Sequence, residues 1–445
     1  MNALLKMFII KSCFYFTFHR TLSVINEDIS SERMTTIKIL ENPNDIPEKM
    51  ISDHQPTTTP VNTPIVSQRT AAKTTAAVED GSQKRPPTDI FSTVSLLQNH
   101  MTHSPVNMVT PNENRSCTAP ITKMVFIKSH KTGSTTMASI FQRYGYRHDL
   151  LFVLPKRSHI FSALNLFTRE MVLPKPKMLT NRSFDILTNH AVYNRKEMDA
   201  VVPNAKYITI VRDPVYQFES AFGYFEWANK GMGLGQHPNP FEAFMMDPLY
   251  YYTTKNYRWK TASKNGQLYD FGIFPNSYKN MSEASLQAKI KQIDKEFDLV
   301  LLTEYFDESL ILLKQLMCWE YDDIIYLSKG VRKDDHRYNI SDEMKLKIRR
   351  WNAGDVLLYD HFNRTLWEKV AKYGLSFESD LAELRRLKQI TTHKCVANDT
   401  VDTSDRRFYK LVSNQNQTDE YCNDLLRYDV AYTTLLKTKF LQYFR

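Results

Sequence analysis

Apolar and polar residues follow two patterns in the part of the chain after residue 117. Short apolar runs rich in β-branched and aromatic residues predict buried strands, and apolar residues that recur every three or four positions predict amphipathic helices. The strand pattern occurs at 124–127, 150–154, 184–188, 206–211, 297–302 and 324–327. The helix pattern occurs at 134–141, 194–201, 214–225, 285–296, 305–319 and 341–373, the last as one helix or two.

The alternation of these strands and helices predicts an α/β fold, with a P-loop-like parallel sheet flanked by helices on both faces. We expect this domain at residues 117–382, with a polar extension at 383–445 packed on its surface. In such a sheet, ligands bind beyond the carboxyl ends of the strands. Lys131, His190 and Arg212 each follow the end of an expected strand. We therefore expect one cleft to collect these three side chains.

The first part of the chain has a different pattern. Residues 1–25 are apolar and aromatic but contain Lys6 and Lys11, and the apolar run is shorter than a spanning helix of roughly 20 residues. We expect an uncleaved signal anchor there; a cleaved signal peptide and a misassigned start are the alternatives. Residues 26–116 are rich in Thr, Ser and Pro and poor in apolar residues, which predicts a disordered stem.

Composition and charge place the chain among globular proteins with acidic partners. Charged residues make up 24% of the chain and aromatic residues 12%, and the formal net charge is +9. There is no long block of Lys and Arg, so we expect no nucleic-acid partner.

Sequons and cysteines indicate the secretory lumen. Seven Asn-X-Ser/Thr sequons occur after residue 113 and none before it. Cys117, Cys318, Cys395 and Cys422 could form two disulfides. Sequence alone leaves the pairing open, although we prefer Cys395 with Cys422 because both lie in the polar C-terminal part. No spacing of side chains indicates a metal site, and none is expected.

The stretch 123–136 combines an apolar run, a short loop and the start of a helix. That geometry points backbone N–H groups and the positive end of a helix dipole at an anion. Gly133 allows close approach of the backbone, and Lys131 adds a positive charge. Hydroxyl donors come from Thr132, Ser134, Thr135 and Thr136. We interpret the stretch as a phosphate-binding loop; the alternative is an ordinary strand-to-helix turn.

This loop differs from the nucleoside-triphosphate P-loop, which has a second glycine and a lysine directly before Ser or Thr. Here Lys131 precedes the single glycine, so its side chain is expected on the strand side of a bound phosphate, within reach of a leaving-group oxygen. The order of residues therefore argues against a P-loop kinase.

A second candidate anion site follows the strand at 206–211. Arg212 can bind a phosphate in bidentate fashion, and Ser220, about two turns into the next helix, can add a hydroxyl. Asp213 is expected to cap that helix and Pro214 to occupy its first position. The alternative is that Arg212 pairs with a carboxylate.

The Lys-Thr-Gly-Ser-Thr loop and the Arg/Ser pair together resemble the sulfotransferases that use 3′-phosphoadenosine 5′-phosphosulfate (PAPS). The segments FIKSHKTGSTT, ITIVRDPVYQFESAF and WNAGDVLLYDHFN look most like the Golgi galactose-3-O-sulfotransferases, and the resemblance covers about residues 121–375. It implies that Lys131 supports the bridging oxygen as the sulfuryl group leaves, and that residues 132–136 surround the 5′-phosphate. It also implies that Arg212 and Ser220 bind the 3′-phosphate.

The base that takes a proton from a sugar hydroxyl is expected to be a histidine. The resemblance places His190 where related glycan sulfotransferases carry a catalytic histidine. His130, beside the lysine of the loop, is the second candidate, and Glu226 is the third because some relatives use a carboxylate.

Two further segments are candidates for ligand contacts. Lys329 and Arg332 belong to a basic loop that resembles one closing over the 3′-phosphate in cytosolic relatives; the alternative is a solvated loop. Tyr257 and Trp259 are suited to stacking on a sugar, although most such aromatic residues belong to the core.

These features predict transfer of a sulfuryl group from PAPS to the 3-hydroxyl of a terminal β-galactose on glycolipid or glycoprotein glycans. The resemblance further implies a single-pass type II protein of the Golgi membrane with a lumenal catalytic domain. One alternative is sulfation of another glycan hydroxyl, such as the 2-hydroxyl of a uronic acid in a glycosaminoglycan. Another is a non-catalytic glycan-binding glycoprotein. The oligomeric state stays open, with a homodimer as one alternative.

Overall fold

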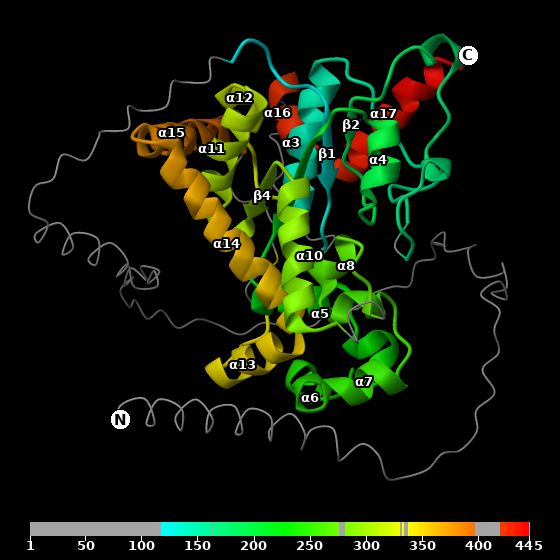
Figure 1. Cartoon of the computed structure of the whole chain (residues 1–445), viewed down its shortest axis with the longest axis vertical. Coiled ribbons are helices and arrows are strands. Elements are labelled where there is room, and N and C mark those ends of the chain that lie inside the picture. The colour runs from blue at the N-terminus through cyan, green and yellow to red at the C-terminus, as the bar shows by residue number, and fades with distance from the viewer. Residues whose placement is uncertain are drawn as a thin grey trace, which may run out of the picture. The chain divides into compact units, whose positions relative to one another are not determined.

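The structure is a computed structural model, and it describes residues 117–162, 164–275, 281–329, 332, 337–396 and 419–444 (Figure 1). The chain divides into two units, Met1–Ser104 and Pro105–Arg445, and all the described residues belong to the second. The predicted anchor and stem therefore lie outside the described residues. Within the described ranges, no helix combines the length and the apolar character needed to cross a bilayer.

The centre of the fold is a parallel sheet with the strand order β2-β1-β3-β4. Its strands are β1 (Met124–Ile127), β2 (Ile186–Leu187), β3 (Lys206–Val211) and β4 (Leu299–Leu302). In the register, Ile127 pairs with Thr209, and Val211 pairs with Leu302. The strands expected at 124–127 and 206–211 are confirmed to the residue, and so is the parallel α/β class.

The helices surround this sheet. They are α3 (Ser134–Arg147), α4 (Arg195–Val201), α5 (Pro214–Tyr224), α6 (Pro240–Met246), α7 (Pro248–Thr254), α8 (Gly266–Asp270), α10 (Glu283–Glu296), α11 (Phe306–Met317), α12 (Tyr321–Ile324), α13 (Asp342–Trp351), α14 (Ala353–Tyr373), α15 (Phe377–Cys395), α16 (Glu420–Leu426) and α17 (Asp429–Gln442). Short 3-10 turns occur at Arg169–Met171, Lys177–Leu179, Lys260–Ser263 and Thr303–Tyr305, and a π-type turn occurs at Ala228–Met232. The expected segment 341–373 is thus two helices.

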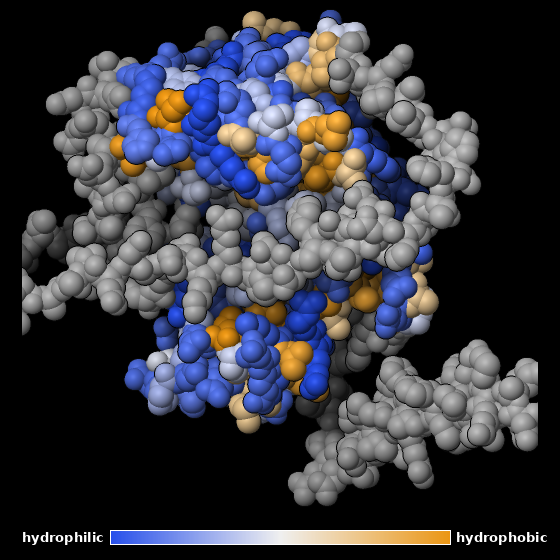
Figure 2. All heavy atoms as spheres, turned by 90° about the vertical axis from the view of Figure 1, so that its left-hand side faces the viewer, coloured by the Kyte–Doolittle hydropathy of each residue, from blue (hydrophilic) through white to orange (hydrophobic). Residues whose placement is uncertain are grey.

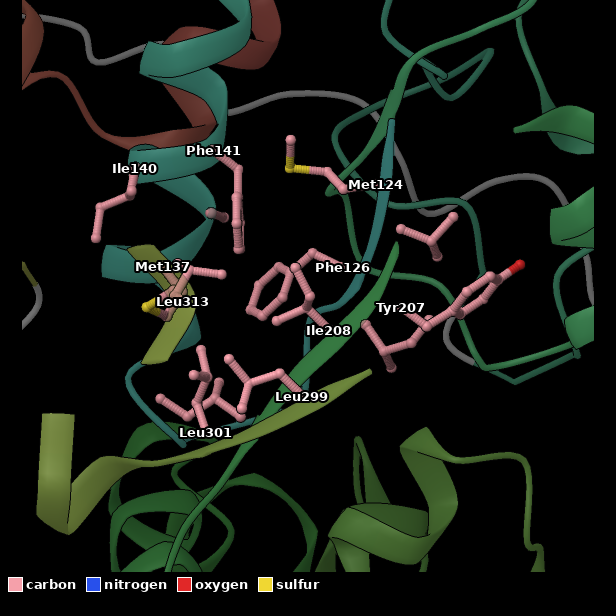
Figure 3. Packing of buried hydrophobic residues seen from close by; sticks show 14 of the residues in the cluster. Met124, Phe126, Met137, Ile140, Phe141, Tyr207, Ile208, Leu299, Leu301 and Leu313 are labelled. Carbon is pink, nitrogen blue, oxygen red and sulfur yellow. The ribbon is translucent and has the colours of Figure 1, made fainter. Parts of the chain in front are cut away.

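Apolar side chains cover both faces of the sheet. Met137 and Phe141 of α3 and Leu313 of α11 pack on one face, against β1, β3 and β4 (Figure 3). Tyr207 of β3 points to the other face, where its ring lies 6.0 Å from that of Phe297. Because both faces are covered, the strands consist mainly of apolar residues.

A second apolar cluster, rich in aromatic residues, joins α5, α6 and α13. Its largest buried members are Phe218, Phe222, Trp227, Phe241 and Phe244. On the face that Figure 2 presents, by contrast, hydrophobic residues form small groups within a mainly hydrophilic surface. Scattered residues of that kind are normal for a protein surface and do not by themselves mark an interface.

The helix after β3 begins as the sequence predicts. The Asp213 side chain accepts a hydrogen bond from Val215 N at 2.8 Å, and Pro214 is the first helical residue. The cap fixes where the chain leaves the sheet, and therefore where Arg212 lies.

Two expected strands were wrong. In the segment 150–154 only Phe152 forms a bridge, to Ile186, and Leu151 N donates to the Asp185 side chain at 2.8 Å instead of to a strand. The segment 324–327 begins with the last residue of α12, and the guanidinium of Arg143 donates a hydrogen bond to the carbonyl of Ile325 at 2.7 Å. In both places a charged side chain forms a hydrogen bond with a backbone group that would otherwise pair with a neighbouring strand. The pattern of apolar residues along the chain cannot predict such contacts.

The C-terminal part of the chain is helical where it is described. Helices α16 and α17 both contact α3. The structure contains the disulfides Cys117–Cys318 and Cys395–Cys422, so the preferred pairing of Cys395 is confirmed. The second disulfide ties the end of α15 to α16.

We expect the double substitution Cys395→Ser and Cys422→Ser to lower the free energy of unfolding by about 3 kcal/mol, because the disulfide closes a loop with a sequence separation of 27 residues. Urea denaturation of the oxidised protein measures this. Cys13→Ser, which breaks neither disulfide, is the control. An unchanged midpoint in the double variant would contradict the expectation.

Candidate active site

The loop between β1 and α3 is shaped by two residues with left-handed backbone angles, Lys131 (φ 63°) and Gly133 (φ 73°). Gly133 is the N-cap of α3, the helix has no side-chain cap, and its first turn contains no acidic residue. The first N–H groups of α3 therefore keep their positive potential for an external anion. Any other residue at Gly133 would be strained by the positive φ.

The hydroxyl groups of this loop mostly hold the loop itself. Ser134 Oγ donates to Ser129 O at 2.5 Å, and Thr132 Oγ1 donates to the same carbonyl at 3.2 Å. Thr136 Oγ1 accepts from Lys329 N at 3.2 Å, while Thr135 is half-buried. The sequence predicted these residues as hydroxyl donors to a phosphate. In the structure, the hydroxyls of Thr132 and Ser134 fix the shape of the loop, and that of Thr136 joins it to Lys329, so backbone N–H groups remain the main candidates for anion contact.

Lys131 and Arg212 lie side by side. Arg212 Nη1 donates to Lys131 O at 3.3 Å, which joins the loop after β1 to the end of β3. Gln267 holds the backbone of Arg212 from both sides, since its Oε1 accepts from Arg212 N at 2.8 Å and its Nε2 donates to Arg212 O at 2.9 Å. Lys131 Nζ lies 3.7 Å from the centroid of the Tyr224 ring. The sequence prediction that these two cations share one edge of the sheet agrees with this geometry.

Arg212 forms no ion pair with any carboxylate in the described part of the chain, so the alternative reading of this residue finds no support. Burial lowers the pKa of the Arg212 guanidinium, and the nearby Glu304 and Glu219 act in the opposite direction. A half-buried guanidinium without a directly bound carboxylate favours binding of an anionic ligand.

The two basic residues of the predicted loop, Arg332 and Lys329, contact different parts of the domain. Arg332 pairs with Glu219 of α5 and lies so close to Gly223 that a Cβ there would be 2.5 Å from Arg332 Nη1. Arg332 therefore reaches the helix that carries Ser220, which is half-buried. Arg332 Nε and Nη1 are buried and have no hydrogen-bond partner among the described residues. Two unused donors at this point suit a phosphate group.

Lys329 lies elsewhere. Its Nζ donates to Arg427 O at 2.8 Å, between α3 and the C-terminal helices. Burial lowers the pKa of Lys329 to about 7, and the neighbouring Arg143 adds to that effect. The sequence expectation that Lys329 and Arg332 act together on one phosphate is therefore not matched by their positions.

Two histidines stack where β1 and β2 end. The ring centroids of His130 and His190 are 4.4 Å apart, and the rings are inclined by 18°. His130 N donates to Asp270 Oδ2 at 2.7 Å, and His130 Nδ1 lies 2.7 Å from Asp270 Oδ1. Because a carboxylate only accepts hydrogen bonds, Nδ1 of His130 carries the proton and Nε2 keeps its lone pair.

His190 differs from His130 because a protein group already uses its Nε2 lone pair. Its Nε2 lies 2.8 Å from Lys128 Nζ, and an ammonium group only donates, so the lone pair of Nε2 is already used. Burial lowers the pKa of His190 well below its usual range, and Lys128 and His130 lower it further. His190 is therefore neutral, with its proton on Nδ1.

The remaining candidates divide between site and core. The Trp259 ring is half-buried, 5.4 Å from the ring of His130 and stacked on Phe225. Tyr257 is buried in the aromatic cluster and its hydroxyl bonds to Ser263 Oγ at 2.7 Å, so it belongs to the core and the sugar-stacking expectation for it was wrong. Glu226 pairs with Lys230.

Sequence reasoning missed three residues of this site: Lys128, Gln267 and Asp270. Lys128 stands within the quoted loop, three positions before Lys131, and its position just after the strand was the available signal. Gln267 and Asp270 come from α8, far along the chain, and no local pattern marks them. The part of the chain that the structure describes contains no cluster of three or more His, Cys, Asp or Glu suited to a metal ion.

Comparison with known proteins agrees with the sequence and the fold. A model of the galactose-3-O-sulfotransferase family matches residues 88–437. The galactosylceramide sulfotransferase of Mus musculus is 32% identical over 296 residues, which make up 66% of this chain and 69% of that protein. The galactose-3-O-sulfotransferase 3 of Mus musculus is 33% identical over 284 residues, or 62% of this chain and 64% of that protein.

A crystal structure of a sulfotransferase from Alicyclobacillus acidocaldarius is 14% identical and covers 54% of this chain and 96% of that chain, with a TM-score of 0.29. That TM-score is too low to support a conclusion about the site. The family match, in contrast, includes the loop after β1, the end of β3 and both histidines. This chain belongs to the galactose-3-O-sulfotransferase family.

Proposed function

We propose that this sulfotransferase moves a sulfuryl group from PAPS to the 3-hydroxyl of a terminal β-galactose. The observation that carries the proposal is the contact of the Arg212 guanidinium with the carbonyl of Lys131. It puts two cationic side chains and an uncapped helix start at one edge of the sheet, as a donor with two separate phosphate groups requires.

The residues present fit such a donor. The first N–H groups of α3 and Lys131 would hold the 5′-phosphosulfate, and Arg212, Ser220 and Arg332 would hold the 3′-phosphate. The two unused donors of Arg332 support the second assignment, because buried N–H groups without partners are rare unless a ligand supplies them. The donor supplies an activated sulfuryl group on a phosphate leaving group.

We assign the base to His130 rather than to His190. The Asp270 carboxylate holds the Nδ1 proton of His130, so Nε2 can take the proton from the attacking sugar hydroxyl. The new bond joins the sugar oxygen to sulfur, the bond from sulfur to the phosphate oxygen breaks, and Lys131 stabilises the negative charge that forms on that oxygen. His190 lacks a free lone pair in this arrangement.

The acceptor side is built around Trp259. Its ring lies beside His130, and an aromatic face packs well against the apolar C–H face of a galactose. A neutral galactoside on a lipid or a protein suits such a platform. Family membership and the names of the relatives support galactose as the acceptor, and they leave the choice between glycolipid and glycoprotein open.

We also propose that the enzyme works in the lumen of the Golgi, anchored by its N-terminal segment. Two disulfides support an oxidising compartment. Of the sequons in the described part, Asn181 and Asn339 are exposed and can carry glycans. Asn363 lies within α14 with its Oδ1 buried, so we expect it to remain unmodified.

Incubation of the protein with labelled PAPS and a panel of glycans tests the function. We expect transfer to neutral β-galactosides at the 3-hydroxyl, with little dependence on salt, because a neutral acceptor is not attracted by charge. Transfer to a glycosaminoglycan that falls steeply with salt would favour the uronic-acid alternative. Absence of transfer to any glycan would overturn the proposed function.

We expect Arg212→Ala to abolish binding to immobilised adenosine 3′,5′-bisphosphate, because the half-buried Arg212 guanidinium is the main charge for the 3′-phosphate. Arg364→Ala, which removes an exposed arginine of α14, is the matched control and should bind normally. Equal retention of both variants would remove Arg212 from the donor site.

We expect His130→Ala to lower kcat by about a thousandfold, within the range of general-base catalysis, while the affinity for adenosine 3′,5′-bisphosphate stays the same. Asp270→Asn should lower kcat as well, because the amide no longer fixes the Nδ1 proton. Single-turnover kinetics and equilibrium binding separate the two effects. Near-normal turnover of His130→Ala would return the role of base to another residue.

A further inference from the structure

A buried ion pair connects the candidate active site to the C-terminal helix. Lys128 follows β1, and Asp429 is the first residue of α17. Lys128 Nζ lies 3.2 Å from Asp429 Oδ2, and the two side chains are only 7% and 11% exposed. An ammonium group buried to this degree is costly without a counter-ion, and Asp429 supplies one.

Lys128 has a second contact, with His190 Nε2 at 2.8 Å. As long as Lys128 is an ammonium, Nε2 must accept and the ring proton must be on Nδ1. His190 Nδ1 is buried and has no hydrogen-bond partner among the described residues. The contact with the Lys128 ammonium therefore places the ring proton of His190 on Nδ1.

Helix α17 contacts the same segment a second time. Thr433, one turn after Asp429, accepts a hydrogen bond from Asn189 Nδ2 at 2.9 Å and donates to Asp429 O at 2.9 Å. Asn189 directly precedes His190. Helix α17 thus contacts the His190 region twice. Thr433 binds Asn189, and Asp429 binds Lys128, which in turn contacts the His190 ring.

We propose that Asp429 is a positioning residue for sulfate transfer: by pairing with Lys128 it fixes the tautomer and the orientation of His190, against which the ring of His130 stacks. The proposal rests on the proposed role of His130 as the base. It makes the C-terminal helix part of the active site, although α17 contributes no group that touches the donor or the sugar.

The physical consequence is a neutral, fixed ring beneath His130. With Asp429 in place, the cation of Lys128 is balanced and its hydrogen bond with His190 has one direction. Without the carboxylate, the ion pair no longer holds Lys128 Nζ beside His190 Nε2, so the contact that selects one tautomer is weakened and both His190 tautomers become accessible. The ring can then rotate, and His130, stacked 4.4 Å away, loses the surface that orients its Nε2.

The test combines a tautomer measurement with kinetics on the full chain labelled with ¹⁵N at the histidine rings. The ¹⁵N chemical shifts report which ring nitrogen carries a proton, and His190→Gln identifies the His190 signals by their loss. In the unsubstituted protein we expect a protonated Nδ1 and an unprotonated Nε2. A protonated Nε2 there would overturn the proposal without any Asp429 variant.

We expect Asp429→Asn to give a mixture of His190 tautomers and to lower kcat by on the order of a hundredfold, the effect of a small misplacement at the reacting centre. The dissociation constant for adenosine 3′,5′-bisphosphate should stay the same. Asp429→Glu, which keeps the charge, should restore the single tautomer and most of kcat. A merely structural role for Asp429 would not produce this pattern of loss and rescue.

Lys439→Ala is the matched control, because it removes another charge of α17, in an exposed pair with Asp149 far from the histidines. It should change neither the tautomer nor kcat. An Asp429→Asn protein with one His190 tautomer and normal kcat would overturn the proposal. If the unsubstituted protein transferred sulfate to no glycan, the proposed function would fail, and the tautomer measurement would still decide whether Asp429 controls His190.

Discussion

The parallel pairing of β1 with β3 is the constraint on which the rest of the site depends. Ile127 and Thr209 are partners in the register, so the two strands end at the same edge of the sheet. The loop after β1 and Arg212 after β3 therefore meet without any further device, and the hydrogen bond from Arg212 to Lys131 O follows from that register. Two residues outside these strands stabilise the contact. Gln267 accepts a hydrogen bond from Arg212 N, and Thr303 donates one to Thr132 O in the loop after β1.

Buried charge organises the catalytic side in the same way. Two carboxylates from distant segments, Asp270 of α8 and Asp429 of α17, each hold one member of the group around the stacked histidines. Their effects differ because one carboxylate accepts from a histidine and the other balances a lysine. Both rings therefore carry their proton on Nδ1, but the Nε2 lone pair of His190 is used by Lys128, whereas His130 is held at Nδ1 by Asp270.

The C-terminal helices show how a peripheral element becomes part of a site. Helices α16 and α17 pack on α3, and the disulfide Cys395–Cys422 ties them to the end of α15. Their polar composition first suggested a surface extension. Several of these polar side chains instead bind to the rest of the domain. Asp424, Asp429 and Thr433 all bond to residues on or near α3 and β1.

The sequence by itself determined the class of fold, the strands at 124–127 and 206–211, the start of α5 and the strand–loop–helix arrangement around Gly133. These features depend on residues that are neighbours along the chain, so periodicity and capping rules can report them. Only the tertiary structure gave His130 and His190 their different partners, placed Lys329 and Arg332 in different contacts, and buried Tyr257 in the core. Those outcomes depend on which side chain reaches a given atom across the fold, because the proton on an imidazole and the use of a lone pair are set by contacts between residues that the sequence keeps far apart.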